Sequence, residues 1–325
     1  MAKSDNLRKA KEAKNDEFYT QMDDIVSEIA QHPDYVKHFQ GKTVFCNCDD
    51  PESSNFVEFF RLFFHTLGLK KMIATHYTKD GSPSYKLEWS GEKLKDDTVN
   101  LIKTPLQGDG DFRSPECIEL LKEADIVCTN PPFSLYREYV GLLEEYQKEF
   151  VIIGSMNSIA YKEIFPLLKD GRMYIGYTCP KEFLQPDGTR KKFGNITWFT
   201  NLDIDKIHEP LPLTKLYHGN EGKYPKYENF DAINVNKVTD IPKDYFGKIG
   251  VPITYMSQHC NDQFTIIGLG NGYLGQSIGI GKIPKKHKAM MRGHSAEGDL
   301  YIMMNGKPKV PYNRIIIQRK AEESL

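Results

Sequence analysis

Four consecutive residues, Asn130-Pro131-Pro132-Phe133, come directly after a short apolar run at 124–129. A run of this kind predicts a buried β-strand, so the tetrad would lie just past the carboxyl end of a strand, where open α/β sheets bind their ligands. An Asn side chain and backbone carbonyls held rigid by two prolines, next to an aromatic ring, would form a slot lined with hydrogen-bond acceptors. Such a slot suits an exocyclic amine on a flat heterocycle. The alternative is a proline-rich turn that only closes the strand.

Strand and helix patterns alternate through the first part of the chain. Apolar runs predict strands at 43–46, 71–77, 124–129, 150–154, 173–177 and 196–200. Apolar residues at helical spacing predict helices through 25–36 and from about 55, 114, 134 and 159. This alternation is typical of an α/β fold with a doubly wound sheet, here ending in a β-rich edge.

The residue composition and the periodicity of the sequence change after about Leu202. Pro, Gly, Asn and Tyr become frequent, and helical periodicity fades. We therefore expect two domains, 1–202 and 203–325. The glycine-rich stretch 268–275 lacks the following helix of a nucleotide-binding fingerprint, so a flexible loop is expected there.

Composition excludes several classes of protein. The 325 residues contain no uninterrupted apolar run of about 18 residues, so no transmembrane helix is expected. The amino end lacks the hydrophobic core of a secretory signal. Six scattered cysteines fit reduced thiols in a cytoplasmic protein. Cys46-Asn47-Cys48 has the wrong spacing for a zinc knuckle, so no metal site is expected.

The net charge of −1 hides a basic carboxyl-terminal segment. Residues 281–320 hold ten lysines and arginines, opposed only by Glu297 and Asp299. A basic region on a nearly neutral protein favours a polyanionic partner bound in one place. The alternative is a solvated lysine-rich surface. The candidates for nucleic-acid contact are Lys282, Lys285, Lys286, Lys288 and Arg292.

Three segments together carry a resemblance to a known family. They are Asp16-Glu17-Phe18-Tyr19-Thr20, Cys46-Asn47-Cys48-Asp49-Asp50-Pro51 and Thr129-Asn130-Pro131-Pro132-Phe133. In order and content they resemble the amino-methyltransferases that use S-adenosyl-L-methionine, and among these the EcoRI-type adenine-specific DNA methyltransferases. The likeness covers nearly the whole chain. It implies a Rossmann-like methyltransferase sheet, with cofactor motifs first, the tetrad mid-chain and a target-recognition region last.

The resemblance implies site-specific methylation of adenine N6 in DNA, with the tetrad as the catalytic motif. Asn130 and the Pro131 carbonyl would accept the two hydrogens of the amine, Pro132 would keep the turn rigid, and Phe133 would stack on the target base. The chemistry agrees, because two acceptors stabilise the charge that develops on a weakly nucleophilic amine. An adenine inside a duplex must also be flipped out to be reached.

The resemblance also implies a binding site for S-adenosyl-L-methionine. Phe18, Tyr19 and Thr20 would border its methionine moiety. Asp111 would accept a hydrogen bond from its adenine amine, with Phe112 against the ring. The alternative for this last pair is an Asp/Gly turn with a buried Phe.

The loop after the first predicted strand departs from the general methyltransferase pattern. Most of these enzymes have a glycine-rich turn there, which lets the backbone approach the cofactor closely. This chain instead has Asn47, Cys48, Asp49 and Asp50. The two aspartates would either bind the methionine ammonium or the ribose, or cap the following helix.

The expected partner is double-stranded DNA, read by the last third of the chain. We expect a monomer that acts alongside a separate cognate restriction endonuclease, or that protects a phage or mobile element. Two alternatives keep the fold but change the function. One is methylation of RNA adenine or of a protein glutamine, and the other is a DNA-binding protein that has lost catalysis.

Overall fold

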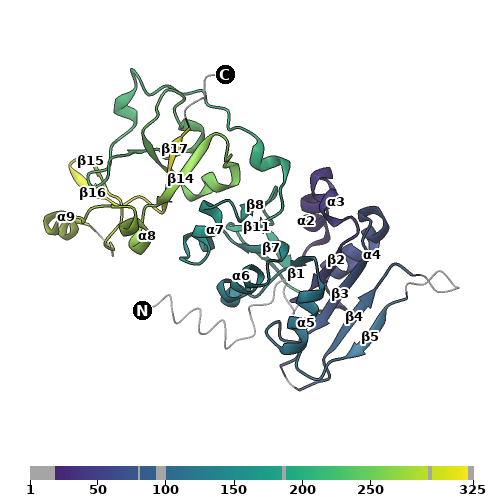
Figure 1. Cartoon of the computed structure of the whole chain (residues 1–325). Helices are drawn as coiled ribbons and strands as arrows, with labels where there is room; N and C mark the ends of the chain where they lie inside the picture. The colour runs from purple at the N-terminus through teal and green to yellow at the C-terminus, as the bar shows by residue number, and fades with distance from the viewer. Residues whose placement is uncertain (1–18, 80, 93–99, 185–187, 292–294, 321–325) are drawn as a thin grey trace. The chain divides into compact units, whose positions relative to one another are not determined.

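The computed structural model describes residues 19–79, 81–92, 100–184, 188–291 and 295–320 (Figure 1). The chain forms two compact units. The first holds the residues through Asn157 together with Met173–Ile204, and the second holds Ser158–Arg172 together with the residues from Asp205 onward. The segment Ser158–Arg172 therefore packs with the carboxyl-terminal part of the chain, although residues of the first unit both precede and follow it in the sequence. No helix in the described part of the chain is long and apolar enough to span a membrane.

The first unit is built on one eight-stranded sheet. Its central strands are parallel and its outer strands antiparallel. The strand order is β5 (Ile102–Pro105), β4 (Tyr85–Trp89), β3 (Lys71–His76), β2 (Thr43–Cys46), β6 (Ile126–Thr129), β7 (Glu149–Ser155), β11 (Ile196–Thr200) and β8 (Tyr174–Ile175). The prediction of an α/β fold with a large sheet is confirmed.

Helices connect the parallel strands and cover the sheet. Helix α4 (Asn55–Leu67) joins β2 to β3, α5 (Pro115–Glu123) leads into β6, and α6 (Tyr136–Glu145) joins β6 to β7. In Figure 1, α4 lies on one side of the sheet, and α5 and α6 lie on the other. The buried face of α4 is largely aromatic; its buried side chains are Phe56, Val57, Phe59, Phe60, Phe64 and Leu67.

The order of the parallel strands creates a switch point between β2 and β6. From β2 the chain moves outward to β3, whereas from β6 it moves outward in the opposite direction to β7. Right-handed crossovers then place the connecting helices on opposite faces. The loops that leave β2 and β6 diverge at this point, which is where open α/β sheets bind ligands.

The predicted helix through 25–36 is broken. Helix α2 (Met22–Ile25) continues as a π-helical turn, Val26–Ala30, and α3 (Pro33–Phe39) starts anew. Pro33 has no backbone N–H to donate to the preceding turn, so it begins a helix and cannot continue one. The remaining strands of this unit form a small sheet of β1 (Tyr19–Thr20), β9 (Glu182–Leu184) and β10 (Arg190–Lys192).

The second unit is mostly strand and turn. Its four-stranded sheet has the order β12 (Ile233–Asn234), β13 (Lys248–Pro252), β17 (Arg314–Arg319) and β14 (Phe264–Leu269). Two further strands, β15 (Ile302–Met304) and β16 (Lys307–Lys309), form an antiparallel hairpin that comes directly before β17 in the sequence. The helices are short: α7 (Phe165–Lys169), α8 (Gly272–Ser277) and α9 (Lys285–Met290). The helix expected from 159 is thus limited to α7.

The prediction of a flexible loop at 268–275 was wrong, because α8 begins inside this stretch. The glycines there serve close packing. A Cβ on Gly275 would lie 2.0 Å from the Gly298 carbonyl oxygen, so the helix rests directly on another backbone segment. The Gly272 N–H also donates to Asp299 at 2.9 Å. The contact that makes these glycines necessary is more than 20 residues away in sequence, so local pattern does not reveal it.

His259 is a buried polar residue in the second unit. Its Nδ1 lies 2.9 Å from the Tyr255 hydroxyl and its Nε2 lies 2.8 Å from Asn261 Oδ1. Because the Asn261 oxygen can only accept, Nε2 carries the proton and Nδ1 accepts from Tyr255. Burial penalises the charged ring and lowers the pKa of His259 from 6.5 to about 4.

This shift predicts a pH dependence of folding. Between pH 6.5 and about 4, His259 is protonated in the unfolded chain but stays neutral in the folded chain. The free energy of unfolding is therefore retained above this pH range and decreases as the pH falls through it. The loss amounts to about 3 kcal/mol in the free energy of unfolding. Urea denaturation across this pH range should show the loss in the native protein and a flatter profile in His259→Gln, whose amide can keep both hydrogen bonds. Parallel profiles would contradict the assignment.

Candidate active site

The tetrad lies directly past the end of β6, as predicted. All four residues of β6 are buried. Asn130 is half-buried and Pro131 is buried, and Phe133 begins a short 3-10 turn that leads into α6. The tetrad therefore lies between a buried strand and a helix that packs on β7, which restrains its backbone from both sides.

The loop after β2 is hydrogen-bonded to this end of β6. The Cys48 N–H donates to the Thr129 hydroxyl oxygen at 3.2 Å. The Thr129 hydroxyl in turn donates to Asp49 Oδ2. The same carboxylate oxygen accepts the backbone N–H of Asn130 at 3.3 Å. One carboxylate and one hydroxyl thus join the two loops at the switch point.

Asp49 and Asp50 have different surroundings. Desolvation raises the pKa of Asp49 to about 6, although the hydrogen bonds from Thr129 and Asn130 oppose this rise. Asp50 turns toward β3, where its Oδ2 lies 3.6 Å from His76 Nδ1. Neither aspartate caps α4. The cap is Ser54, whose hydroxyl oxygen accepts the Phe56 N–H at 3.0 Å.

Phe112 reaches the same region from the loop after β5. Its ring is 5% exposed and packs edge-on against Tyr139 of α6, with the ring centroids 5.1 Å apart. The Tyr139 hydroxyl donates to Asn47 Oδ1. Tyr139 therefore links the loop after β2 to the loop after β5. No sequence motif singled it out, because an aromatic residue on an amphipathic helix is most often an ordinary core residue.

Asp111, next to Phe112, is held by Arg113. Its carboxylate accepts from Arg113 Nε at 2.8 Å and from Nη2 at 2.7 Å. This bidentate pair lowers the pKa of Asp111, so the side chain is ionised at neutral pH and can only accept hydrogen bonds. Arg113 also reaches Glu138 of α6 at 3.2 Å, which ties the loop to the helix.

The third predicted cofactor segment is only partly described, since Phe18 lies outside the described residues. Tyr19 and Thr20 form β1, and the Thr20 carbonyl accepts from Asn55 Nδ2 at 2.6 Å, at the start of α4. Thr20 Oγ1 and Asn47 Nδ2 are buried and have no hydrogen-bond partner in the part of the chain that the structure describes. Buried polar groups normally have partners, so these two atoms fit a site for a polar ligand such as S-adenosyl-L-methionine.

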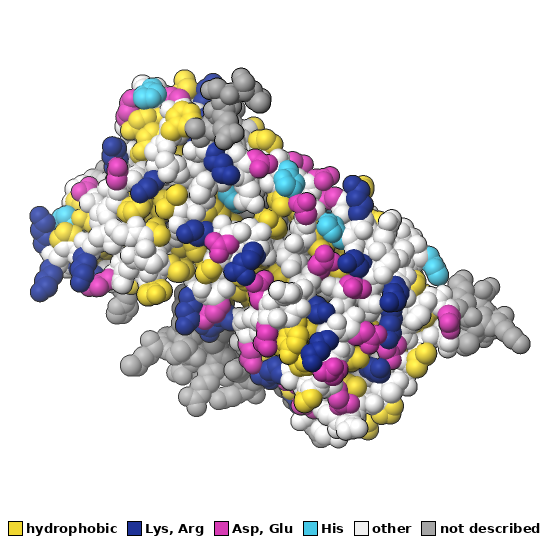
Figure 2. Space-filling view, viewed as in Figure 1, with side chains coloured by type: hydrophobic (Ala, Val, Ile, Leu, Met, Phe, Trp, Pro, Cys, Tyr) yellow, Lys and Arg dark blue, Asp and Glu magenta, His cyan; other side chains and the backbone are white. Residues whose placement is uncertain are grey.

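The lysines predicted to contact nucleic acid gather in the second unit. Lys285, Lys286 and Lys288 lie on α9 and are exposed, and Lys282 lies just before it. Arg292 is outside the described residues. Helix α9 packs beside β16, which adds two further exposed lysines, Lys307 and Lys309. Figure 2 shows basic side chains crowded at the left edge, where Figure 1 places α9.

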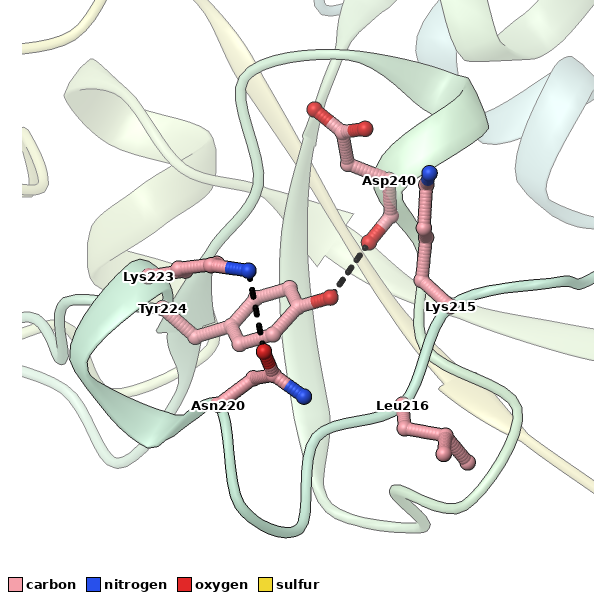
Figure 3. A pocket seen from close by; sticks show the side chains of 6 residues that line it. All are labelled: Lys215, Leu216, Asn220, Lys223, Tyr224 and Asp240. Atoms are coloured by element: carbon pink, nitrogen blue, oxygen red, sulfur yellow. Dashed lines mark hydrogen bonds between the residues drawn. The ribbon is translucent and has the colours of Figure 1, made fainter.

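The second unit also has a surface hollow of about 250 Å³ (Figure 3). The Lys223 ammonium donates to Asn220 Oδ1 at 2.9 Å, and the Tyr224 hydroxyl donates to the Asp240 carbonyl at 3.1 Å. None of the predicted site residues lines it. The lining residues are Lys215, Leu216, Asn220, Lys223, Tyr224 and Asp240.

Comparison with known proteins identifies the family. The family model described as "Adenine-specific methyltransferase EcoRI" matches residues 6–320. The chain belongs to this family of adenine-specific methyltransferases.

Curated relatives agree with the family match. The chain is 44% identical to the type II methyltransferase M.EcoRI of Escherichia coli, over 86% of this chain and 93% of that protein. It is 39% identical to the type II methyltransferase M.MpnI of Mycoplasma pneumoniae, over 97% of this chain and 98% of that protein. A third type II methyltransferase, from Mycoplasma genitalium, is 37% identical over 82% of this chain and 87% of its own length. The search of solved structures found no match.

The two glycines before Asp111 give a matched test of this region. A Cβ on Gly110, where φ is +78°, would lie 2.1 Å from the His76 carbonyl oxygen, whereas one on Gly108 would lie 3.4 Å from the Glu116 carboxylate. Gly110→Ala should displace Asp111 and Phe112 and weaken binding of S-adenosylhomocysteine about tenfold or more, a loss of about 1.4 kcal/mol. Gly108→Ala should bind nearly as the native protein does. Calorimetric titration measures both, and equal affinities would count against a cofactor role for the loop.

Proposed function

We propose that this protein transfers a methyl group from S-adenosyl-L-methionine to N6 of an adenine flipped out of duplex DNA. The observation that carries the proposal is the Asn-Pro-Pro-Phe tetrad at the switch point of the sheet, in a chain of the adenine-specific family. The first unit would be a Rossmann-like catalytic domain. The second unit would hold the target-recognition region.

In this proposal the tetrad activates the amine. The lone pair of an exocyclic amine is delocalised into the ring, so the amine is a weak nucleophile. Asn130 Oδ1 and the Pro131 carbonyl would each accept one of its hydrogens and draw it toward tetrahedral geometry. Both acceptors stabilise the positive charge that grows on nitrogen during attack, because they are already oriented before the reaction starts. Phe133 would stack on the extrahelical base.

The surrounding loops would hold the cofactor. S-adenosyl-L-methionine supplies a methyl group on a positively charged sulfur. The buried atoms Thr20 Oγ1 and Asn47 Nδ2, which have no partner among the described residues, support placement of its polar end near β1 and β2. The ionised carboxylate of Asp111 and the ring of Phe112 support placement of its adenine near the loop after β5.

The proposed biological setting is a restriction-modification system. The similar bacterial proteins are named type II methyltransferases. By that likeness the chain would act as a cytoplasmic monomer on DNA, while a separate endonuclease cuts the unmethylated site. Protection of a phage or mobile element is the second setting.

A labelling experiment tests the reaction and the tetrad together. The protein is incubated with tritiated S-adenosyl-L-methionine and duplex DNA, RNA or protein. Label should enter DNA, as N6-methyladenine. Asn130→Ala should lower the rate at least about a hundredfold, since one of two oriented acceptors is removed, while binding of S-adenosylhomocysteine stays within about threefold.

Asn100→Ala, a change to a half-buried residue before β5, is the control and should leave both values near native. Label in RNA or protein alone would replace the DNA proposal. Absence of label in every substrate would favour a DNA-binding protein without catalysis. Near-native turnover by Asn130→Ala would remove the tetrad from the mechanism.

The lysines of α9 make a separate prediction about DNA binding. Replacing Lys285, Lys286 and Lys288 with Gln should weaken binding in a salt-dependent way. For every lysine that binds a DNA phosphate, its replacement should reduce the slope of log affinity against log salt by about one. Fluorescence anisotropy at several salt concentrations measures this slope. The control replaces three exposed lysines elsewhere in the second unit, Lys162, Lys169 and Lys237. Equal weakening in both triple variants would mean that only net charge matters.

A further inference from the structure

Two aspartates connect the central strands β2 and β6 at opposite ends. At the amino end, the Asp125 carboxylate accepts the Thr43 N–H at 2.8 Å. At the carboxyl end, the Asp49 carboxylate accepts the Thr129 hydroxyl and the Asn130 N–H. The same strand pair therefore carries one carboxylate link far from the tetrad and one that acts on the tetrad itself.

The link at the carboxyl end holds the backbone of Asn130. Thr129 is fully buried, and its hydroxyl accepts from Cys48 N–H while donating to Asp49. The next donor along the chain is the Asn130 N–H, which meets the same Oδ2 atom. A hydrogen bond to an ionised acceptor is stronger than a neutral one. Fixing this N–H limits rotation about the Asn130 backbone, and so limits where its side chain points.

We propose that Asp49 is a positioning residue for the tetrad: its carboxylate holds Asn130 and the following Pro131 carbonyl where they can meet the target amine. Asp49 then acts from the loop after β2, through the Asn130 backbone, and is not a ligand of the cofactor. This inference rests on the proposed methyl transfer to adenine.

Activation of the amine requires precise placement of both acceptors. Two acceptors activate an amine only if both meet its hydrogens at once, and a shift of about 1 Å in a reacting group costs about a hundredfold in rate. The tetrad follows a four-residue strand, and its last residue begins a 3-10 turn. Pro131 disfavours helical backbone at Asn130, but neither proline ring makes a hydrogen bond to the Asn130 N–H. The Asp49 carboxylate supplies that restraint.

The test compares Asp49→Asn with Asp125→Asn in the full-length protein. Both changes keep the size of the side chain and remove its charge. Measurements are the single-turnover rate on duplex DNA at saturating S-adenosyl-L-methionine, the Kd for S-adenosylhomocysteine, and the thermal midpoint. We expect Asp49→Asn to slow methyl transfer about a hundredfold with Kd within about threefold of native. Asp125→Asn should lower the midpoint and leave the single-turnover rate near native.

Two outcomes would overturn the proposal. If Asp49→Asn raises Kd strongly and saturating cofactor restores the rate, Asp49 binds the cofactor. If Asp49→Asn, like Asp125→Asn, changes only the midpoint, both are structural links between strands. Activity of the native protein is measured in the same experiment, so absence of DNA methylation there would refute the proposed function and would be distinguishable from either outcome.

A second variant tests the path from Asp49 to the tetrad. Thr129→Val removes the hydroxyl that donates to Asp49 and keeps the shape of the side chain. If both residues act on Asn130 through one network, the double variant should be about as slow as Asp49→Asn alone, because effects within a shared network do not add. Rate reductions that multiply would show independent roles. Duplex DNA with 2-aminopurine at the target position should still show base flipping in both variants.

Discussion

The arrangement of the site depends on the parallel pairing of β2 with β6. In this pairing Val44 lies opposite Ile126, and Phe45 lies opposite Val127. The two strands belong to crossovers that run in opposite directions, so their carboxyl ends meet while the chain after them diverges. A shift of one residue would turn the strands' side chains to the other face. It would also separate Asp49 from Thr129 and Asn130, whose hydrogen bonds close this end of the sheet.

Polar groups inside the two units are held in different ways. In the first unit the buried Glu28 accepts the N–H groups of Tyr177 and Thr178 at 2.8 and 2.7 Å, so the carboxylate orders a turn. In the second unit the buried guanidinium of Arg314 donates to the side-chain oxygens of Asn234 and Asn236, each at 3.0 Å. In each network, hydrogen bonds offset the unfavourable free energy of burying an ionisable side chain. The excess positive charge of the second unit lies on its surface, above all on the exposed lysines of α9.

The sequence correctly predicted those strands and helices that are specified by the pattern of neighbouring apolar residues. The strands at 43–46 and 196–200 and the helices from about 55 and 114 all match the structure. The predictions were wrong where a proline or a contact between residues distant in the sequence determines the local structure. Pro33 divides one expected helix into two. Gly275 lies in α8 and has no room for a side chain, because the Gly298 carbonyl oxygen lies where its Cβ would be. Ser158–Arg172 packs with the second unit, which no feature of its own sequence indicates.

The sequence by itself determined the chemistry that this protein can offer: an acceptor tetrad after a buried strand, candidate cofactor segments before it, and a basic segment at the carboxyl end. These are properties of neighbouring residues, and they were sufficient to identify the family. Only the tertiary structure decided which loops share a hydrogen bond. Asp49 and Asn130 are 81 positions apart, and Tyr139 and Asn47 are 92 apart. Contacts at such separations depend on strand order, because adjacency in a parallel sheet is set by the crossovers between its strands.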